Sequence, residues 1–158
     1  MAITTRRPGD DDKGIDMTES ATMKPLLTEI DHIAIAVPDL DAGIEYYRET
    51  FGATVDHREI VESDGVEEAL LKVAESYVQL LTPTREDSTV AKWLSNRGRP
   101  GIHHVGYRVA DCAEALESVK RQGFRVLDDA PRPGSRGTTV AFIHPKDALG
   151  TLIELVQE

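Results

Sequence analysis

The stretch IDHIAIAV at residues 30–37 returns as IHHVGYRV at residues 102–109. A second pair of segments matches near the end of each half of the chain, VQLL at 78–81 and IELV at 153–156. Matched segments in the same order are the sign of a repeated structural unit. The chain is therefore predicted to be an internal duplication whose two halves share one fold.

Each repeat unit keeps polar residues at two matched places inside apolar strand patterns. His32 matches His104 in the first pair of segments, and Gln79 matches Glu154 in the second. Repeats usually preserve apolar faces, whereas a buried imidazole or carboxylate costs free energy unless something binds it. We expect all four side chains to meet at one bound metal ion.

The first matched segments alternate strictly between two faces, as half-buried strands do. His32 shares its face with Ala34 and Ala36, and His104 shares its face with Gly106. Small neighbours leave room for a ligand beside each histidine, whereas large ones would fill a core. The other histidines are expected outside the ligand set: His103 on the opposite face as a supporting or structural residue, and His57 and His144 in loops.

A helix is expected after each of the two matched strands. Asp39 is suited to cap a helix that ends at Gly52, and Asp111 is suited to cap one that ends near Gly123. Between the halves, a short helix with Ser88 as its cap is expected in the linker. These signals place one helix in each half and a third between them.

Three strand-like segments follow each of the two principal helices. They are expected at residues 53–60, 67–74 and 76–81 in the first half and at 125–130, 138–144 and 151–157 in the second. Each half is then a βαβββ module, and the bare faces of two such sheets can close around a cleft. The fold class is α+β, with two pseudo-symmetric modules forming a half-barrel. We expect one domain over residues 26–158, with modules at about 28–84 and 101–158 and a linker helix at about 85–100.

The composition of the chain excludes several classes of binding partner and setting. The formal net charge of the 158 residues is -10, which argues against nucleic acid as a ligand. The single cysteine, Cys112, excludes an intramolecular disulfide and suits a cytoplasmic setting. No apolar run is long enough to span a membrane. The polar and acidic residues 1–25 are expected to form a disordered tail, derived in part from an expression tag or an upstream start.

The matched residues His32, Gln79, His104 and Glu154 form a ligand set of two nitrogens and two oxygens without sulfur. Such a set suits a divalent ion such as cobalt, zinc, manganese, nickel or iron in an open site. With one carboxylate and a neutral amide, the bound ion keeps positive charge that can polarise a carbonyl or stabilise an enolate. A single histidine in a strand is more often a packed or solvated residue, but four matched residues favour a metal site.

Over residues 28–158 the chain resembles the methylmalonyl-CoA epimerases of the vicinal oxygen chelate superfamily. The matching stretches are IDHIAIAVPDLD, YYRETFG, DGVEEALL, YVQLLTP, STVAKWL, GIHHVGYRV, HPKDALG and LIELVQ. The resemblance implies one divalent ion, often cobalt in this family, held by His32, Gln79, His104 and Glu154. It also implies that Glu68 in DGVEEALL is a catalytic base, a role that the residues alone leave open against a solvated strand position.

The implied reaction interconverts the 2R and 2S forms of methylmalonyl-CoA. A proton leaves the carbon between a thioester and a carboxylate, a metal-stabilised enolate forms, and a proton returns to the opposite face. Two acid/base groups on opposite sides accomplish this without rotating the intermediate. Glu68 is our candidate for one group. Glu154 is the candidate for the other, although a metal-bound carboxylate is a poor base, so water or a neighbouring group is an alternative.

An acyl-CoA substrate requires cationic groups for its phosphates, and loops offer several. The candidates are Arg97, Arg99, Arg132, Arg136 and Lys146. The turn at residues 133–137 is flexible enough to cover a ligand or to present backbone amides to a carboxylate. The resemblance also implies a homodimer.

Three other functions remain open for this fold. A glyoxalase-type isomerase shares the enediolate chemistry but often has a second carboxylate where Gln79 stands. An extradiol-type dioxygenase would use iron held by His32, His104 and Glu154. A metal-free module that sequesters a drug would leave the four buried polar residues unexplained, and a metal assay separates it from the enzymes.

Overall fold

The computed structural model describes residues 24–158. Its elements in chain order are β1 (Glu29–Ala36), α1 (Leu40–Phe51), β2 (Val55–Val61), β3 (Val66–Val73), β4 (Ser76–Pro83), α2 (Thr89–Arg97), β5 (Gly101–Arg108), α3 (Cys112–Arg121), β6 (Arg132–Pro133), η1 (Ser135–Gly137), β7 (Thr139–Ile143), η2 (Pro145–Asp147) and β8 (Ile153–Gln157). The tail predicted for residues 1–25 lies outside the described residues, except for residues 24 and 25.

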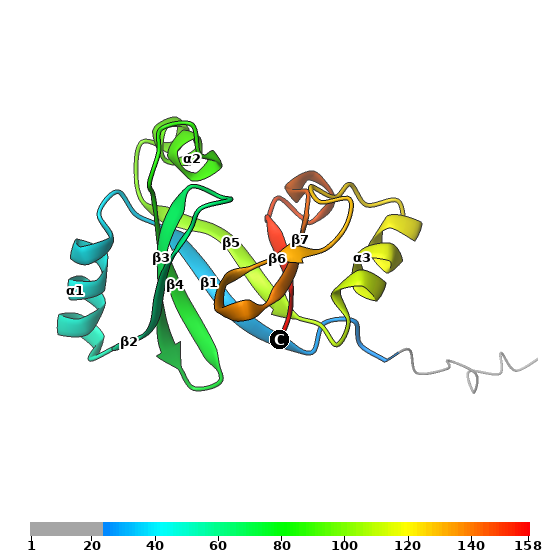
Figure 1. Ribbon diagram of the computed structural model, residues 1–158, viewed down its shortest axis with the longest axis horizontal. Coiled ribbons are helices and arrows are strands. Elements are labelled where there is room, and N and C mark those ends of the chain that lie inside the picture. Colours follow the sequence, from blue (N-terminus) through cyan, green and yellow to red (C-terminus); the bar gives the residue numbers. More distant parts are fainter. Residues whose placement is uncertain (1–23) are drawn as a thin grey trace, which may run out of the picture.

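The strands form one curled sheet in the order β2-β3-β4-β1-β5-β8-β7-β6. We call β1 to β4 with α1 module one, and β5 to β8 with α3 module two. In each module the first strand pairs in parallel with the last, and β1 and β5 pair antiparallel where the modules meet. Figure 1 shows α1 and α3 on the two outer sides of the curled sheet, with α2 at its upper rim. The predicted α+β half-barrel is confirmed.

The three helices begin at the predicted caps. The side chains of Asp39, Ser88 and Asp111 accept hydrogen bonds from backbone N–H groups in the first turns of α1, α2 and α3. These bonds satisfy donors that have no partner inside a helix. Gly52 and Gly98 then end α1 and α2 in the left-handed region, at φ of 68° and 71°, which glycine adopts without steric cost.

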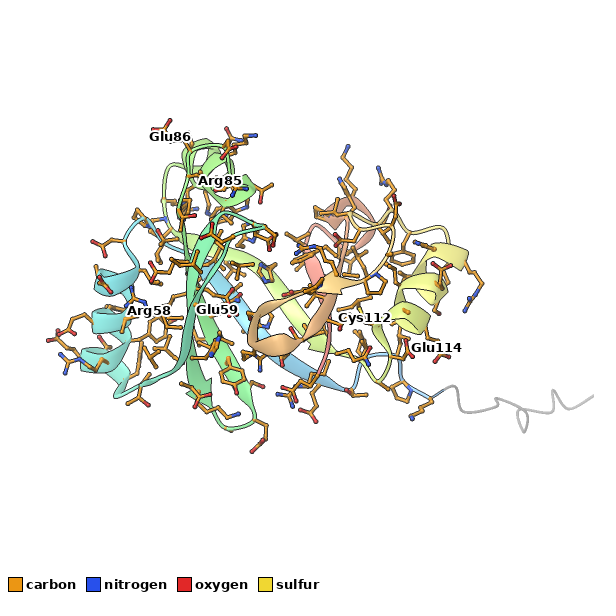
Figure 2. The ribbon with its side chains drawn as sticks, in the orientation of Figure 1. Arg58, Glu59, Arg85, Glu86, Cys112 and Glu114 are labelled. Carbon is orange, nitrogen blue, oxygen red and sulfur yellow. The ribbon has the colours of Figure 1, made fainter. Side chains whose placement is uncertain are left out.

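Separate apolar cores attach the outer helices to the convex side of the sheet. In module one, α1 packs on β3 and β4 around Leu40, Leu71 and Leu80. In module two, α3 packs on β7 and β8 around Leu116 and Leu155. Figure 2 labels Cys112 at the start of α3, where the buried thiol belongs to this second core. Because the helices cover the convex side, the opposite face of the sheet is left for a site.

The strand predicted at residues 125–130 is wrong. Only an isolated bridge joins Val126 to Ile143, and a two-residue strand, β6, follows at Arg132–Pro133. The Asp128 carboxylate accepts a 2.8 Å hydrogen bond from the N–H of Phe142, a donor that a continuing strand would otherwise use. Pro131 and Pro133 supply no N–H to a ladder. Within residues 125–130, backbone hydrogen bonds therefore join β7 and His144 to residues 125–127 only, and beyond them the Asp128 side chain takes the place of backbone pairing.

The placement of His57 in a loop is also wrong, because this residue lies in β2. His144 precedes η2 and caps it, outside any strand, as predicted. Within residues 24–158, no helix combines the length and apolarity that crossing a membrane requires.

Candidate active site

Two rows of residues across the centre of the sheet carry the four predicted ligands. In one row, Gln79 on β4 pairs with Ala34 on β1, which pairs with His104 on β5. In the other, Glu154 on β8 pairs with Gly106 on β5, which pairs with His32 on β1. Each row therefore reads oxygen ligand, small residue, histidine, and the two rows run in opposite directions.

The small residue in each row gives the histidines their space. A β-carbon built on Gly106 would lie 2.3 Å from Cε1 of His32, a separation that van der Waals repulsion forbids. The ring of His32 thus lies directly over the backbone of β5. The sequence analysis expected small neighbours to leave room for a ligand, whereas at Gly106 the space is filled by the ring of His32 itself.

His32, His104 and Glu154 converge on one point. The two Nε2 atoms are 3.0 Å apart, and Oε2 of Glu154 lies 2.9 Å from Nε2 of His32 and 3.1 Å from Nε2 of His104. All three residues are buried, with at most 8% of their surface exposed. Among residues 24–158 they are the group of histidine, cysteine or acidic side chains whose ligand atoms lie close enough together to hold a metal ion.

A β-bulge precedes each histidine of this cluster. Between the paired residues Ile30 and His32, the register of β1 against β5 shifts by one residue, so Asp31 is the extra residue. A second shift makes His103 the extra residue before His104. A bulge breaks strict alternation and re-aims the side chains beside it. Assigning His103 to the opposite face by alternation is therefore wrong.

Each bulged residue binds the Nδ1 atom of the histidine that follows it. Oδ2 of Asp31 is 2.7 Å from Nδ1 of His32, and Nδ1 of His103 is 2.9 Å from Nδ1 of His104. When Nδ1 carries the proton of each cluster histidine, Nε2 presents its lone pair to the centre of the cluster. Asp31 was not among the residues predicted from sequence. The polar pairs DH and HH at matched places in apolar strands were the signal that could have found it.

The charges of the cluster without an ion are strongly coupled. Burial opposes a charge on His32, but the carboxylates of Asp31 and Glu154 outweigh it and raise its pKa to about 9. Burial would raise the pKa of Glu154, yet hydrogen bonds from His104 and His32 hold it well below the ordinary value. In the metal-free protein the cluster is therefore an ion pair between an imidazolium and a carboxylate.

The donor set fits a divalent ion. Ligands about 2.1 Å from an ion and at right angles to one another lie about 3.0 Å apart. The observed separations of 2.9 to 3.1 Å match such an arrangement of His32, His104 and Glu154 with positions left open. The buried Oε1 of Gln79 has no hydrogen-bond partner among the described residues and is therefore available as a fourth donor. A buried polar atom of this kind calls for a partner.

Glu68 lies beside Gln79 and is also buried, with 5% of its surface exposed. Nε2 of Gln79 donates a 2.7 Å hydrogen bond to Oε2 of Glu68, and Oε1 of Glu68 has no partner among the described residues. Burial raises the pKa of Glu68 to about 7. The negative charges of Glu154 and Glu59 also raise this pKa, whereas the Ser135 side chain lowers it. Glu67 faces away and pairs with Arg58, as expected from alternation.

A cavity of about 370 Å³ contains these side chains. His32, Gln79, His104 and Glu154 line it together with Glu68. Apolar walls come from both modules, and the loop at residues 134–138 closes one side with Gly134, Ser135, Arg136 and Thr138. The cavity thus joins a carboxyl group of tuned pKa to a cluster suited to a cation, which is the arrangement needed to move a proton on an acidic carbon.

The basic residues predicted to meet phosphates divide into two groups. Arg132 and Arg136 line the cavity but are already paired with carboxylates. Arg132 pairs with Asp64 and Asp128. Arg136 pairs with Asp31 and Glu158. Arg97, Arg99 and Lys146 are exposed and have no carboxylate partner within the described chain. Arg97 stacks over Trp93, 5.0 Å from the ring centre, and lines a second cavity of about 460 Å³.

The two cavities share walls. His103, Leu127 and Leu152 line both of them. The second cavity is bounded by α2 on one side and by the segment His144–Pro145, at the start of η2, on the other. A ligand that fills the first cavity therefore has an adjoining groove that leads toward unpaired cations.

Comparison with known proteins agrees with this geometry. Residues 31–142 match the family described as the Glyoxalase/Bleomycin resistance protein/Dioxygenase superfamily. The ethylmalonyl-CoA/methylmalonyl-CoA epimerase of Cereibacter sphaeroides is 38% identical over 133 residues, which cover 84% of this chain and 99% of that protein. The mitochondrial methylmalonyl-CoA epimerase of Mus musculus is 34% identical over 83% of this chain and 74% of its own length.

Solved structures give the same result. A variant of the Streptomyces coelicolor methylmalonyl-CoA epimerase in complex with 2-nitronate-propionyl-CoA is 48% identical, with a TM-score of 0.81 over 84% of this chain and 98% of that one. The methylmalonyl-CoA epimerase of Mycobacterium tuberculosis is 42% identical, with a TM-score of 0.81 over 85% of this chain and 91% of that one. The chain belongs to the glyoxalase/bleomycin resistance protein/dioxygenase superfamily and, within it, to the family of methylmalonyl-CoA epimerases.

Proposed function

We propose that this protein is a metal-dependent epimerase that interconverts the 2R and 2S forms of methylmalonyl-CoA. The observation that carries the proposal is the union, in one cavity, of the Glu68 carboxyl with its pKa near 7 and the cluster of His32, His104 and Glu154. A base of this pKa is suited to take and return a proton at neutral pH. Relatives named for this activity, with high identity over most of the chain, support it.

In this proposal His32, Gln79, His104 and Glu154 hold one divalent ion. When bound, such an ion supplies Lewis-acid stabilisation of negative charge on the oxygens of the deprotonated acyl group. Gln79 would have two roles, because its oxygen would be a ligand of the ion while its amide N–H donates a 2.7 Å hydrogen bond to the Glu68 carboxylate. That hydrogen bond fixes one Glu68 oxygen and leaves Oε1 as the atom that takes the proton from the substrate.

Proton delivery to the other face of the acidic carbon is assigned to Glu154, with an oriented water as the alternative. Glu154 belongs to module two, and Glu68 to module one, so the two carboxyl groups come from different halves of the sheet. The two histidines that donate to Glu154 keep its pKa low and make it a weak base. Glu68 is therefore the stronger acid/base group of the pair.

The second cavity is the proposed path of the CoA arm. It adjoins the first and has Arg97 in its wall, while Lys146 follows the lining residue Pro145 in the sequence and Arg99 lies two residues after Arg97. Among the described residues these three cations have no carboxylate partner. In a chain with a formal net charge of -10, such cations are the natural partners of phosphate groups. Arg132 and Arg136, which are already paired, are better suited to hold the loop and the cavity wall.

A dioxygenase could use His32, His104 and Glu154 as an iron triad. Glu68 argues for the epimerase, because an oxygenase needs no buried carboxyl group of raised pKa beside the fourth ligand. A metal-free drug-binding module is disfavoured by the unpartnered oxygens of Gln79 and Glu68, since buried polar atoms without partners destabilise a fold.

The test is proton exchange at the acidic carbon. Protein purified without chelator is analysed for metal, stripped, reloaded with Co²⁺ and incubated with methylmalonyl-CoA in heavy water, and mass spectrometry follows deuterium uptake. We expect about one ion per chain and one deuteron per substrate, with exchange lost on stripping. Stoichiometry near zero would contradict the metal site, and one ion per chain without exchange would contradict the epimerase.

Cobalt is the proposed native ion, with zinc, manganese and nickel as alternatives that the same ligands accept. Reloading with each ion and comparing exchange rates tests this choice. The homodimer and the cytoplasmic setting also remain proposals. Light scattering on the purified protein decides the first, and cell fractionation decides the second.

A further inference from the structure

We propose that Asp31 is a positioning residue that fixes the ring of His32 and couples it to the loop at residues 134–138, which closes the substrate cavity. The proposal rests on the function proposed above, because it assigns His32 to the metal site. It concerns a residue that lies outside the four ligands and outside the acid/base pair.

The first step is the burial of Asp31. It is fully buried, at 0% exposure, in a strand whose next residue is a proposed ligand. A carboxylate in this position costs much free energy unless other groups bind it. The bulge at Asp31 inserts the residue into β1 and brings its side chain to the ring of His32. The insertion thus places a charged group where strict alternation would have turned it away.

The second step is the sharing of one carboxylate oxygen. Oδ2 of Asp31 accepts from Nδ1 of His32 at 2.7 Å and also from Nη2 of Arg136 at 2.8 Å. Oδ1 accepts separately from Nε of Arg108 at 2.9 Å. Arg136 and the imidazole therefore share one acceptor oxygen, which binds both donors at once. Because both donors bind this oxygen, the charge and position of Arg136 affect the hydrogen bond that orients the ring.

The third step connects Arg136 to the substrate cavity. Arg136 belongs to η1 and adopts a left-handed backbone at φ of 56°, a conformation that costs free energy for any residue but glycine. Its N–H donates to Glu59, labelled in Figure 2, and its guanidinium lies 4.7 Å from the ring centre of Tyr77. These contacts hold the loop in place, and Ser135 of the same loop borders the cavity next to Glu68.

The fourth step is the contrast with His104. The partner of its Nδ1 is the ring nitrogen of His103 at 2.9 Å, whereas the partner of His32 is the carboxylate of Asp31. No arginine bridges His103 to the loop in the hydrogen bonds of the described chain. The two matched histidines are thus oriented by different means, and only His32 is connected to the loop.

The test measures Co²⁺ binding in the full-length protein by titration calorimetry and by the visible absorption of the bound ion. Asp31→Ala should weaken Co²⁺ affinity by about 10- to 100-fold, the usual effect of losing an outer-shell partner, and should change the absorption spectrum. Asp31→Asn keeps an acceptor for Nδ1 and should lose less. Glu29→Gln is the matched control, because Glu29 also accepts from Arg108 but does not contact His32.

The coupling to the loop is tested by Arg136→Gln alone and combined with Asp31→Ala. We expect Arg136→Gln to change Co²⁺ affinity by itself, and to change it far less when Asp31 is absent, because the two act through one oxygen. Thermal unfolding of the metal-free variants separates this role from a general loss of stability. Wild-type affinity and spectrum in Asp31→Ala, or additive effects in the double variant, would overturn the proposal.

These readouts need no substrate. A protein that binds Co²⁺ in this pattern but does not exchange the substrate proton would retain the role of Asp31 and contradict the epimerase. Failure of the wild-type protein to bind Co²⁺ would overturn both.

Discussion

Module one and module two build the same strand frame but present different side chains to the shared cavity. Glu68 of β3 pairs with Leu81, two residues past Gln79, and Val140 of β7 pairs with Val156, two residues past Glu154. Glu68 and Val140 therefore occupy equivalent places. Module one has a buried carboxyl group there, and module two has an apolar side chain.

The same comparison holds for the ligands. Module one contributes a neutral amide, Gln79, where module two contributes the carboxylate of Glu154. The duplicated frame thus fixes the positions from which side chains enter the cavity, and the differences between the halves divide the chemistry. In the proposed mechanism, module one supplies the base, and module two supplies the negative charge of the cation site.

The largest effect on activity is expected from removing the buried carboxyl group of Glu68, which module two lacks. Glu68→Gln is nearly isosteric and should lower kcat about 10²- to 10⁴-fold, the usual contribution of a general base, while leaving bound metal unchanged. Steady-state epimerisation and metal analysis measure the two quantities. Glu67→Gln on the outer face is the matched control and should retain wild-type rates. Loss of metal in Glu68→Gln would move Glu68 into the coordination shell.

The next prediction concerns a variant in which both rows of paired residues, the one through Ala34 and the one through Gly106, have alanine at the centre. Gly106 stands opposite His32 where Ala34 stands opposite His104, so Gly106→Ala removes this difference. The new methyl group would displace the His32 ring, since the built contact is 2.3 Å. We expect roughly 10-fold or greater loss of Co²⁺ affinity by calorimetry. Gly43→Ala in α1, far from the cavity, should bind Co²⁺ normally, and equal losses in both variants would refute the local explanation.

A third variant gives the two modules the same oxygen ligand. Gln79→Glu should retain or strengthen metal binding but slow proton abstraction, because added negative charge opposes the charge that develops on the substrate. A roughly 10-fold lower kcat corresponds to about 1.4 kcal/mol. An unchanged kcat with tighter metal binding would show that the charge of the site does not limit the reaction.

The raised pKa of Glu68 predicts a pH-dependent stability in the metal-free protein. Its folded-state pKa is about 7, above the ordinary 4.5, so protonation favours the native state and this stabilisation is lost as pH rises through that interval. Glu68→Gln should therefore raise the melting temperature more at pH 8 than at pH 5, by the equivalent of roughly 1–2 kcal/mol. A constant difference between the two pH values would contradict the shift.

Local sequence patterns, repeated in the two halves of the chain, predict most of the strands and helices. Strict alternation and side-chain caps predict the paired strands β1 and β5 and the helices that follow them, because both signals are local. The segment 125–130 fails for a non-local reason, since its apolar residues suggest a strand while the Asp128 side chain bonds the N–H of Phe142.

The site likewise has features that local sequence patterns predict and features that depend on contacts between distant segments. The four proposed ligands follow from matched positions in the repeat, and the structure brings His32, His104 and Glu154 to within hydrogen-bond distance of one another. The contact of Asp31 with His32 is not predicted, because alternation assigns Asp31 to the opposite face. The bulge that turns it back depends on the register of two strands, which no single segment encodes. The pKa of Glu68 likewise depends on burial by residues distant in sequence.

The smallest expected effect concerns the groove beside module two. Arg97→Glu should raise KM for methylmalonyl-CoA severalfold at low ionic strength and less at high salt, because an exposed cation interacts with phosphate through a screened field. Arg121→Glu at the end of α3 makes the same charge change away from the second cavity and should leave KM unchanged. A shortened thioester that lacks the nucleotide should show no difference between wild type and Arg97→Glu. If Arg121→Glu raised KM as much as Arg97→Glu, the net charge of the protein would account for the effect, and the groove would have no part in holding the CoA arm.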